Sequence, residues 1–300
     1  MKYKKIYTLI SVLILLVLLY SAGNFVYFNF RVSNFLDTLS YLRILPDFIG
    51  IAGVALFYFS GFKKSNLLRW FMCFVLFSFP FDIWYYILYF TGEQAHQGLS
   101  GTGSKFTLFL IIGMFITVLL VTCCAAGLWL LSKEKTARLT FNIYDGKRVG
   151  EFQPAGAGIR FLNRITDVIV MMFIVISNLR TFAFFFRSSF NPKSYWELYL
   201  AEIFFLVVYY LLLEGIFNTT AGKCATNTVI VNENGERPHF GQILGRTFAR
   251  LIPLEAISFL GADARGWHDT LSNTYVVAAA NKGEEEADEI TLDAEQNLAQ

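Results

Sequence analysis

The sequence predicts an all-α polytopic membrane protein with about six transmembrane helices and small cytoplasmic β-hairpin segments. Three observations carry this prediction: long apolar runs, few charges and many aromatic residues. Of the 300 residues, 55% are hydrophobic and only 16% are charged, whereas about 25% are charged in a typical soluble domain. Aromatic residues make up 17% of the chain, and such side chains are enriched at both membrane–water interfaces. A soluble fold of this length would need more polar surface.

Six apolar stretches are long enough to cross a bilayer, which takes about 20 mainly apolar residues in a helix. They cover residues 6–28, 41–62, 67–90, 106–131, 159–186 and 198–217. A shorter apolar stretch at 251–260 predicts an interfacial helix. The first span begins like a secretory signal, with lysines before it and Ser21-Ala22-Gly23 within it. Its apolar character continues through Phe28, which favours a helix that is retained.

Basic residues orient these spans. Lysine and arginine gather before the first span, between the second and third, after the fourth and after the sixth, whereas the other loops contain few. The positive-inside rule therefore predicts a multi-pass membrane protein with both termini in the cytoplasm. The basic residues are not gathered on one face, so we expect the lipid bilayer, and no nucleic acid, as a partner. The oligomeric state is left open.

The chain divides into four regions by composition. Residues 1–135 form a four-helix transmembrane region, and residues 136–153 form a cytoplasmic linker with a hairpin. Residues 154–280 hold two further spans and a cytoplasmic segment. The acidic tail at 281–300 predicts a solvated, disordered end.

Three segments have β character. Residues 139–152 alternate around Asp145-Gly146, and residues 228–237 alternate around Asn234-Gly235. A dipeptide of this kind between alternating residues is a strong hairpin signal. Residues 274–277 form a third, short β-like run. We expect the three segments to pair into a small cytoplasmic sheet.

The fifth span carries charged residues at helical spacing. Arg160, Arg164 and Asp167 share one helix face, which continues to Asn178. A charge at the bilayer centre costs about 2.5–3.5 kcal/mol on insertion scales, so such residues face the bundle or a water-filled cavity. Pairing of Arg164 with Asp167 within the helix would lower that cost. Three interpretations stay open: a structural ion pair, an ion or substrate site, and a lipid-phosphate clamp formed by the two arginines.

Further polar residues lie at a similar predicted depth. Glu214, near the inner end of the sixth span, is the expected partner of the fifth-span arginines. His268 and Asp269 follow a basic and aromatic segment that starts at Arg265. Asp269 either caps the start of a helix or forms a salt bridge, or it reaches the Arg160 end of the fifth span.

The sequence contains no soluble catalytic signature, with no GxSxG, HExxH or Walker A pattern. We therefore expect no enzymatic activity and no cofactor. The four cysteines have no metal-ligand spacing, which predicts small packing residues without a metal and without a disulfide. They are Cys73, Cys123, Cys124 and Cys224.

The C-terminal part of the chain resembles the RDD family of bacterial membrane domains, which is named for one Arg and two Asp. The opening segment from Ala157 to Asp167 is similar to the family's first helix, with Arg160 as the Arg and Asp167 as the first Asp. Glu214 and Gly222-Lys223 resemble a later Glu and Gly-Lys pair. The closing Arg-Gly-x-His-Asp pattern ends at Asp269, the second Asp. The chain departs from the family after Lys223, where a second basic residue is often found.

The resemblance implies a protein of the bacterial inner (plasma) membrane for which transport is proposed, with cation–proton exchange suggested for some members. On this hypothesis the protein transports an ion or small solute. Asp167 would bind a cation or proton, assisted by Glu214, while Arg160 and Asp269 would form a cytoplasmic gate. Arg164, Asn178 and His268 would complete the polar network. The alternative is a non-transporting scaffold, assembly or lipid-binding module in which the same residues serve packing.

Overall fold

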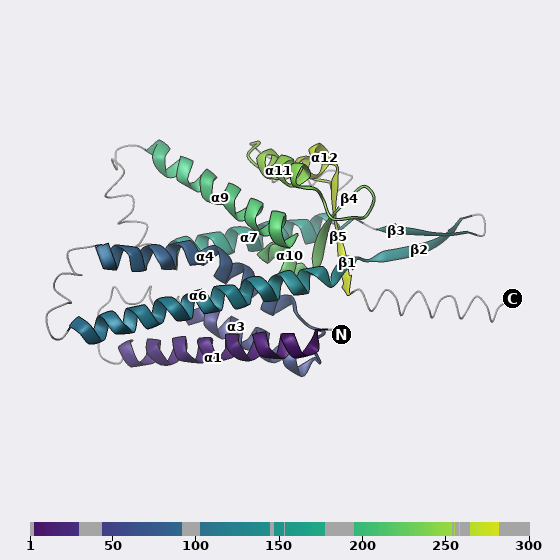
Figure 1. Cartoon of the computed structure of the whole chain (residues 1–300). Helices are drawn as coiled ribbons and strands as arrows, with labels where there is room; N and C mark the ends of the chain where they lie inside the picture. Colours follow the sequence, from purple (N-terminus) through teal and green to yellow (C-terminus); the bar gives the residue numbers. More distant parts are fainter. Residues whose placement is uncertain are drawn as a thin grey trace. The chain divides into compact units, whose positions relative to one another are not determined.

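The computed structural model describes residues 3–29, 44–91, 103–144, 147–152, 154–177, 195–253, 255, 258 and 265–281. Six long helices match the six predicted spans, and Figure 1 shows them in chain order. They are α1 (Lys4–Asn29), α3 (Ile44–Phe59), α4 (Asn66–Thr91), α6 (Gly103–Lys133), α7 (Ala157–Ser177) and α9 (Tyr195–Phe217). The last part of the predicted fifth span, 178–186, lies outside the described residues.

Three of these helices are long and apolar enough to cross a membrane within the described part of the chain. The qualifying stretches are Lys4–Gly23, Asn66–Ile83 and Leu110–Lys133. Helix α3 is apolar but has only 16 residues, and α7 contains three charged residues, Arg160, Arg164 and Asp167. The predicted fold class, a mostly helical polytopic membrane protein, is confirmed.

The described residues form two compact units. One comprises residues within Trp129–Asp167 and Ala201–Gln300, and the other comprises residues within Tyr3–Leu128 and Val168–Leu200. We call them the network unit and the helical unit. Helices α6, α7 and α9 contribute residues to both units. The four domain ranges predicted from the sequence stay predictions.

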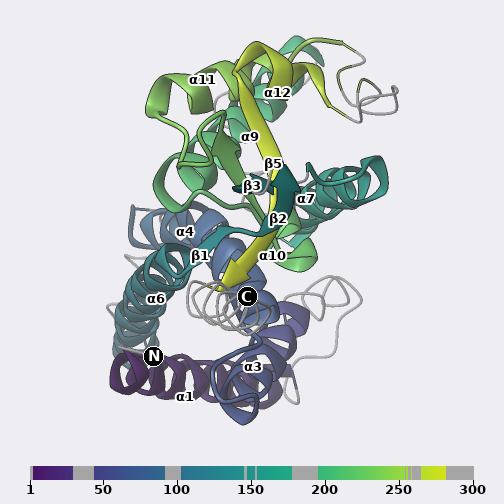
Figure 2. The same cartoon turned by 90° about the vertical axis from the view of Figure 1, so that its right-hand side faces the viewer.

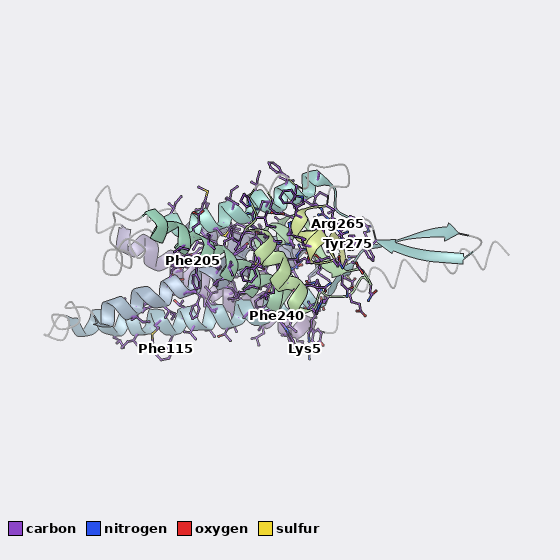
Figure 3. All side chains as sticks on the ribbon, turned by 90° about the horizontal axis from the view of Figure 1, so that it is seen from above. Lys5, Phe115, Phe205, Phe240, Arg265 and Tyr275 are labelled. Carbon is purple, nitrogen blue, oxygen red and sulfur yellow. The ribbon has the colours of Figure 1, made fainter. Side chains whose placement is uncertain are left out.

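The helical unit has an aromatic core and an apolar exterior. The Tyr7 ring meets the Phe57 ring edge-on at a centroid distance of 5.8 Å. A Cβ at Gly53 would lie 3.0 Å from the Leu68 backbone, so α3 and α4 approach closely there. Phe115, labelled in Figure 3, is 66% exposed although it is a large apolar side chain. Such outward-facing residues suit helices surrounded by lipid.

The cysteines agree with their predicted packing role. All four are buried and free of disulfides.

The network unit contains two small antiparallel sheets. Strands β2 (Leu139–Tyr144) and β3 (Lys147–Phe152) form the predicted hairpin, although Asp145 and Gly146 lie outside the described residues. The second sheet has the order β1-β5-β4, from β1 (Lys135–Ala137), β5 (Thr274–Asn281) and β4 (Thr228–Asn232). β5, the long yellow arrow in Figure 2, is the central strand.

The second predicted hairpin is wrong. β4 pairs with β5 from Thr228 opposite Ala278 to Asn232 opposite Thr274, and residues 233–237 form no strand. The Asn234-Gly235 signal does produce a turn, in which the Asn232 side chain accepts the backbone N–H groups of Asn234 and Glu236 at 2.9 Å each. The chain then enters helix α11 (Phe240–Ala249) instead of returning as a strand. The three β segments therefore form two sheets, not one.

Two further short helices complete the network unit. Helix α10 (Ala221–Thr226) follows α9, and helix α12 (Trp267–Leu271) precedes β5. Together with α11 they cover the ends of α7 and α9 that belong to this unit (Figure 1).

Candidate functional site

In the part of helix α7 from Arg160 to Asp167, most polar side chains point inward and the large apolar side chains point outward. Arg160, Asn163 and Asp167 are buried and Arg164 is half-buried, so the predicted polar stripe is confirmed. Asn178, the last predicted member of the stripe, lies outside the described residues. The residues between the stripe positions are large, apolar and exposed: Phe161, Leu162 and Ile165.

Asp167 is hydrogen-bonded on all sides. Its Oδ1 accepts the Tyr209 hydroxyl and the Gly222 backbone N–H, each at 2.7 Å. Its Oδ2 accepts the Thr220 hydroxyl at 3.0 Å and the Tyr210 hydroxyl at 3.4 Å. An ionised carboxylate offers about four lone-pair positions. These four donors therefore occupy the carboxylate and tie α7 to α9 and α10.

The predicted pair between Arg164 and Asp167 is wrong. The Arg164 Nη1 donates instead to the Tyr210 hydroxyl at 2.9 Å, and its guanidinium lies 5.8 Å from the Tyr210 ring centroid. The physical reason is competition, because donors from α9 and α10 already surround Asp167. Arg164 thus reaches the carboxylate only through Tyr210.

Gly222 explains why a Gly-Lys pair follows the sixth helix. A Cβ at this position would overlap the carbonyl oxygen of Asn163 and would lie 2.9 Å from its Cα. The obstacle is backbone, which cannot move aside as a flexible side chain would. The missing side chain lets α10 approach α7 closely enough for the Gly222 N–H to reach Asp167.

Asp269 forms the predicted ion pair with Arg160 and a second one with Arg246. The Nε2 atom of His268 lies 3.4 Å from the same carboxylate. Burial alone would raise the pKa of Asp269, but the guanidinium groups of Arg246 and Arg160 outweigh burial and hold that pKa below its usual range. Asp269 does not cap α12, whose N-cap is Gly266.

Glu214 binds three cations, none of which belongs to α7. The Lys223 Nζ and the Arg250 Nη2 each lie 2.7 Å from its Oε1, and the Arg246 Nε lies 3.5 Å from its Oε2. The predicted pairing of Glu214 with the fifth-span arginines is therefore wrong. α10 and α11 supply the partners because they cover the end of α9.

The cations around Glu214 respond differently to burial. Burial lowers the pKa of Lys223 even though Glu214 favours its charged form. Burial acts in the same direction on Arg250, but Glu214 outweighs it and raises the pKa of Arg250 above its usual range.

Arg246 joins the two carboxylates. Its side chain is fully buried, with 0% exposed, and it contacts Glu214, Asp269 and the Thr274 hydroxyl. Among the residues that the structure describes, the Nη2 atom of Arg246 has no hydrogen-bond acceptor, and neither has the Nη2 atom of Arg160. Two buried guanidinium groups thus retain unused donors.

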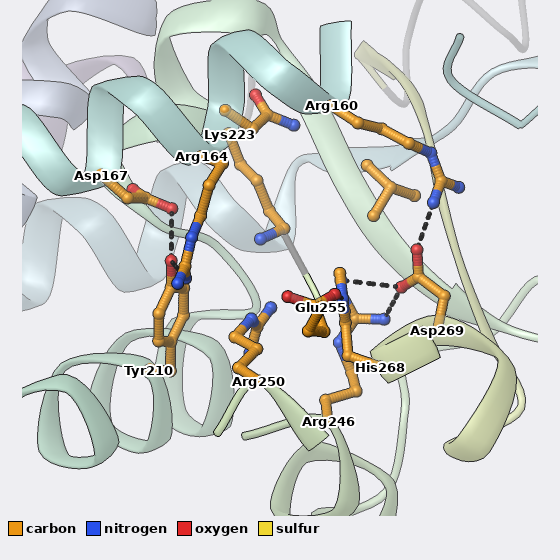
Figure 4. A pocket seen from close by; sticks show the side chains of 12 residues that line it. Arg160, Arg164, Asp167, Tyr210, Lys223, Arg246, Arg250, Glu255, His268 and Asp269 are labelled. Atoms are coloured by element: carbon orange, nitrogen blue, oxygen red, sulfur yellow. Dashed lines mark hydrogen bonds and ion pairs between the residues drawn. The ribbon is translucent and has the colours of Figure 1, made fainter. Parts of the chain in front are cut away.

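A cavity of about 40 Å³ lies among these groups (Figure 4). Space for one water takes about 10–15 Å³, so the cavity has room for about three waters or a small polar group. The lining residues are Arg160, Asn163, Arg164, Asp167, Tyr210, Lys223, Arg246, Arg250, Glu255, His268, Asp269 and Val276.

The cavity and its ion pairs carry an excess of positive charge. The cations are Arg160, Arg164, Lys223, Arg246 and Arg250, and the carboxylates are Asp167, Glu214, Glu255 and Asp269. Burial lowers the pKa of His268 despite the neighbouring Asp269 and Glu255, which favours the neutral imidazole. Five positive charges therefore face four negative ones.

Several residues of the site do not follow from the sequence patterns used above. Arg246 lies in α11 and Arg250 is the C-cap of that helix, one turn later. On sequence grounds they count only as basic residues of a cytoplasmic segment. The signal that could have identified them is their spacing of four residues, which puts both arginines on the same side of the helix as the buried Ile243. Tyr209 and Tyr210 have no such signal, since they lie within a continuous apolar run.

The described residues offer no group of three or more His, Cys, Asp or Glu side chains that could hold a metal ion.

Asp167→Asn is expected to lower thermal stability in detergent, because the amide NH₂ would face N–H and O–H donors. Leaving buried donors unsatisfied costs about 1–3 kcal/mol. Adding Arg164→Gln should bring no recovery, since Arg164 contacts Tyr210 rather than Asp167. Thermal unfolding of the two single variants and the double variant tests this. Recovery in the double variant would mean that Arg164 and Asp167 do compensate one another.

Comparison with known proteins gives one match. Residues 154–273 match the RDD family. Neither the search of curated proteins nor the search of solved structures gave a match. The matched range contains α7, α9, α10, α11 and α12 and every residue around the cavity except Val276. The C-terminal part of this membrane protein, which holds Arg160, Asp167 and Asp269, therefore matches the RDD family over residues 154–273.

Proposed function

We propose that this protein binds a small anion in the cavity of its RDD domain and that the binding serves transport of that anion. One observation carries the proposal: Arg246 and Arg160 both line the cavity, and each has a buried guanidinium Nη2 atom without an acceptor among the described residues. A buried donor without a partner costs free energy. An anion in the cavity would remove that cost and would meet planar, charged donors suited to oxyanions.

The charge balance supports an anion as the ligand. Arg164, with only a tyrosine hydroxyl among its described hydrogen-bond partners, also lines the cavity. A phosphate, sulfate or carboxylate group would offset the excess of one positive charge. Because the cavity is about 40 Å³, the ligand group is small or is the head of a larger molecule.

Cation–proton exchange with Asp167 as the ion site stays a prediction, and the surroundings of the carboxylates weigh against it. Four donors occupy Asp167. Glu214 already faces three cations, and Asp269 faces two arginines. A cation entering the cavity would have to displace one of these partners.

The expected result is that inorganic phosphate or sulfate raises the melting temperature of the purified protein in detergent, while chloride at equal ionic strength does so less. A ligand at 100 times its Kd stabilises the folded state by about 2.7 kcal/mol. Arg164→Gln should weaken the effect, because Arg164 lines the cavity without a carboxylate partner. Arg138→Gln is the matched control, because Arg138 is exposed. Equal melting temperatures with all three anions would contradict anion binding.

Two further experiments distinguish a free anion from the phosphate of a lipid headgroup. In proteoliposomes, uptake of labelled phosphate that is lost in Arg164→Gln and kept in Arg138→Gln supports transport of a free anion. Stabilisation by phosphatidylglycerol over phosphatidylcholine, without uptake, would instead assign the site to a lipid phosphate. That outcome would support a non-transporting lipid-binding module.

A further inference from the structure

Helix α11 is amphipathic in the reverse sense from a helix of a soluble protein. Its buried side carries Ile243, Arg246 and Thr247, whereas Phe240 is 67% exposed and Phe248 is 52% exposed. Phe240, at the start of the helix, is labelled in Figure 3. A helix in water normally turns its charged side outward. Here the guanidinium of Arg246 points into the protein and the phenyl rings point out.

The apolar surface continues beyond α11. Ile252 follows the helix and is 39% exposed. Helix α12, which lies beside α11 in both views (Figures 1 and 2), adds Trp267 at 45% and Leu271 at 66%. We call these five residues the α11–α12 face: Phe240, Phe248, Ile252, Trp267 and Leu271. Large exposed apolar residues gathered on two neighbouring helices mark a surface that contacts something other than water.

Ion pairs determine at which point along α9 the α11–α12 face lies. Arg246 and Arg250 both contact Glu214, which lies three residues before the end of α9 at Phe217. At a rise of 1.5 Å per residue this is about 5 Å from the helix end. The end of a spanning helix meets the headgroup region, where Trp and Tyr are enriched. The α11–α12 face therefore lies at interfacial depth if α9 spans the bilayer.

We propose that the α11–α12 face is a membrane-interface surface that lies in the headgroup and acyl boundary of the bilayer that α9 is predicted to cross. Its occupant is lipid. An amphipathic helix in this position lies in the plane of the interface, with its apolar side inserted by about 5–10 Å. The inward side of α11 remains free to hold Glu214 and Asp269. The proposal is independent of what the cavity binds.

Spin labels test this in proteoliposomes of phosphatidylcholine and phosphatidylglycerol. Phe248→Cys and Leu271→Cys carry nitroxide labels on the face, and both positions are exposed, so the substitutions disturb no core contact. Asn234→Cys, exposed in the turn that precedes α11, is the aqueous control. Leu162→Cys, on the exposed side of α7, is the lipid control. The unsubstituted chain, with four buried cysteines, is the labelling blank.

The nitroxide labels at 248 and 271 should be accessible to oxygen, which dissolves in lipid, and inaccessible to a water-soluble nickel complex. The label at 162 should behave in the same way, and the label at 234 should be accessible to nickel. Nickel accessibility at 248 and 271 equal to that at 234 would overturn the proposal. Shielding from both oxygen and nickel, with dipolar broadening between labels, would also overturn it, because it would show that a second copy of the chain covers the face.

Discussion

Asp269→Ala is expected to lower the free energy of unfolding in detergent by about 3–5 kcal/mol, because removing one partner of a buried ion pair strands the other. Here two guanidinium groups are stranded, those of Arg160 and Arg246. Chemical or thermal unfolding measures the loss. Glu236→Ala, at an exposed carboxylate of the same unit, should change stability little.

The contribution of the Arg160 pair follows from a double-mutant cycle. Arg160→Ala alone should also destabilise, and the double variant with Asp269→Ala should lose less than the sum of the two. The physical reason is that Asp269→Ala strands the Arg160 guanidinium, and the double change removes that stranded charge while Arg246 still loses its Asp269 partner. Strictly additive losses would show that Arg160 and Asp269 are energetically independent despite their contact.

Glu214→Gln should be at least as destabilising, about 3–5 kcal/mol, because one carboxylate serves three buried cations. Burial already lowers the pKa of Lys223, and losing Glu214 removes the attraction that opposes burial. When the folded-state pKa of a lysine lies below its unfolded value, the unfolded chain holds more protons. Stability then rises with pH.

The Glu214→Gln variant should therefore regain part of its loss as the pH rises from neutral toward about 10, the ordinary lysine range. Melting temperatures across that range measure the recovery. Glu202→Gln is the matched control, since Glu202 lies on the same helix and is exposed. A Glu214→Gln variant whose melting temperature ran parallel to that of the control at every pH would show that Lys223 is not coupled to Glu214.

The helices and the α7 stripe were predictable because local patterns determine them. A run of about 20 apolar residues has few alternatives to a membrane helix, and the 3.6-residue period places Arg160 and Asp167 on one side. The pair of Arg160 with Asp269 followed from the RDD resemblance, since no spacing rule connects two residues 109 positions apart.

The choice of partners within the site was not predictable in the same way. Arg164 and Asp167 have suitable spacing for a pair, but Tyr210, Thr220 and Gly222 from other elements compete for the carboxylate. The same competition redirects Glu214 to cations of α10 and α11. Likewise, the Asn234-Gly235 signal specifies a turn, while β4 finds its partner in β5, whose paired residues lie 42 to 50 positions later.

The 109-residue separation between Arg160 and Asp269 has a consequence for biogenesis. Ribosomes add about 5–20 residues per second, so α7 emerges about 5–20 s before its countercharge does. Arg246, which supplies the second ion pair to Asp269, also arrives late. During that interval Arg160 has to remain at the lipid headgroups or with the insertion machinery. A chain that ends before residue 269 would leave the Arg160 guanidinium without its carboxylate partner. An unpaired arginine of this kind is a feature by which membrane quality control could recognise incompletely synthesised chains.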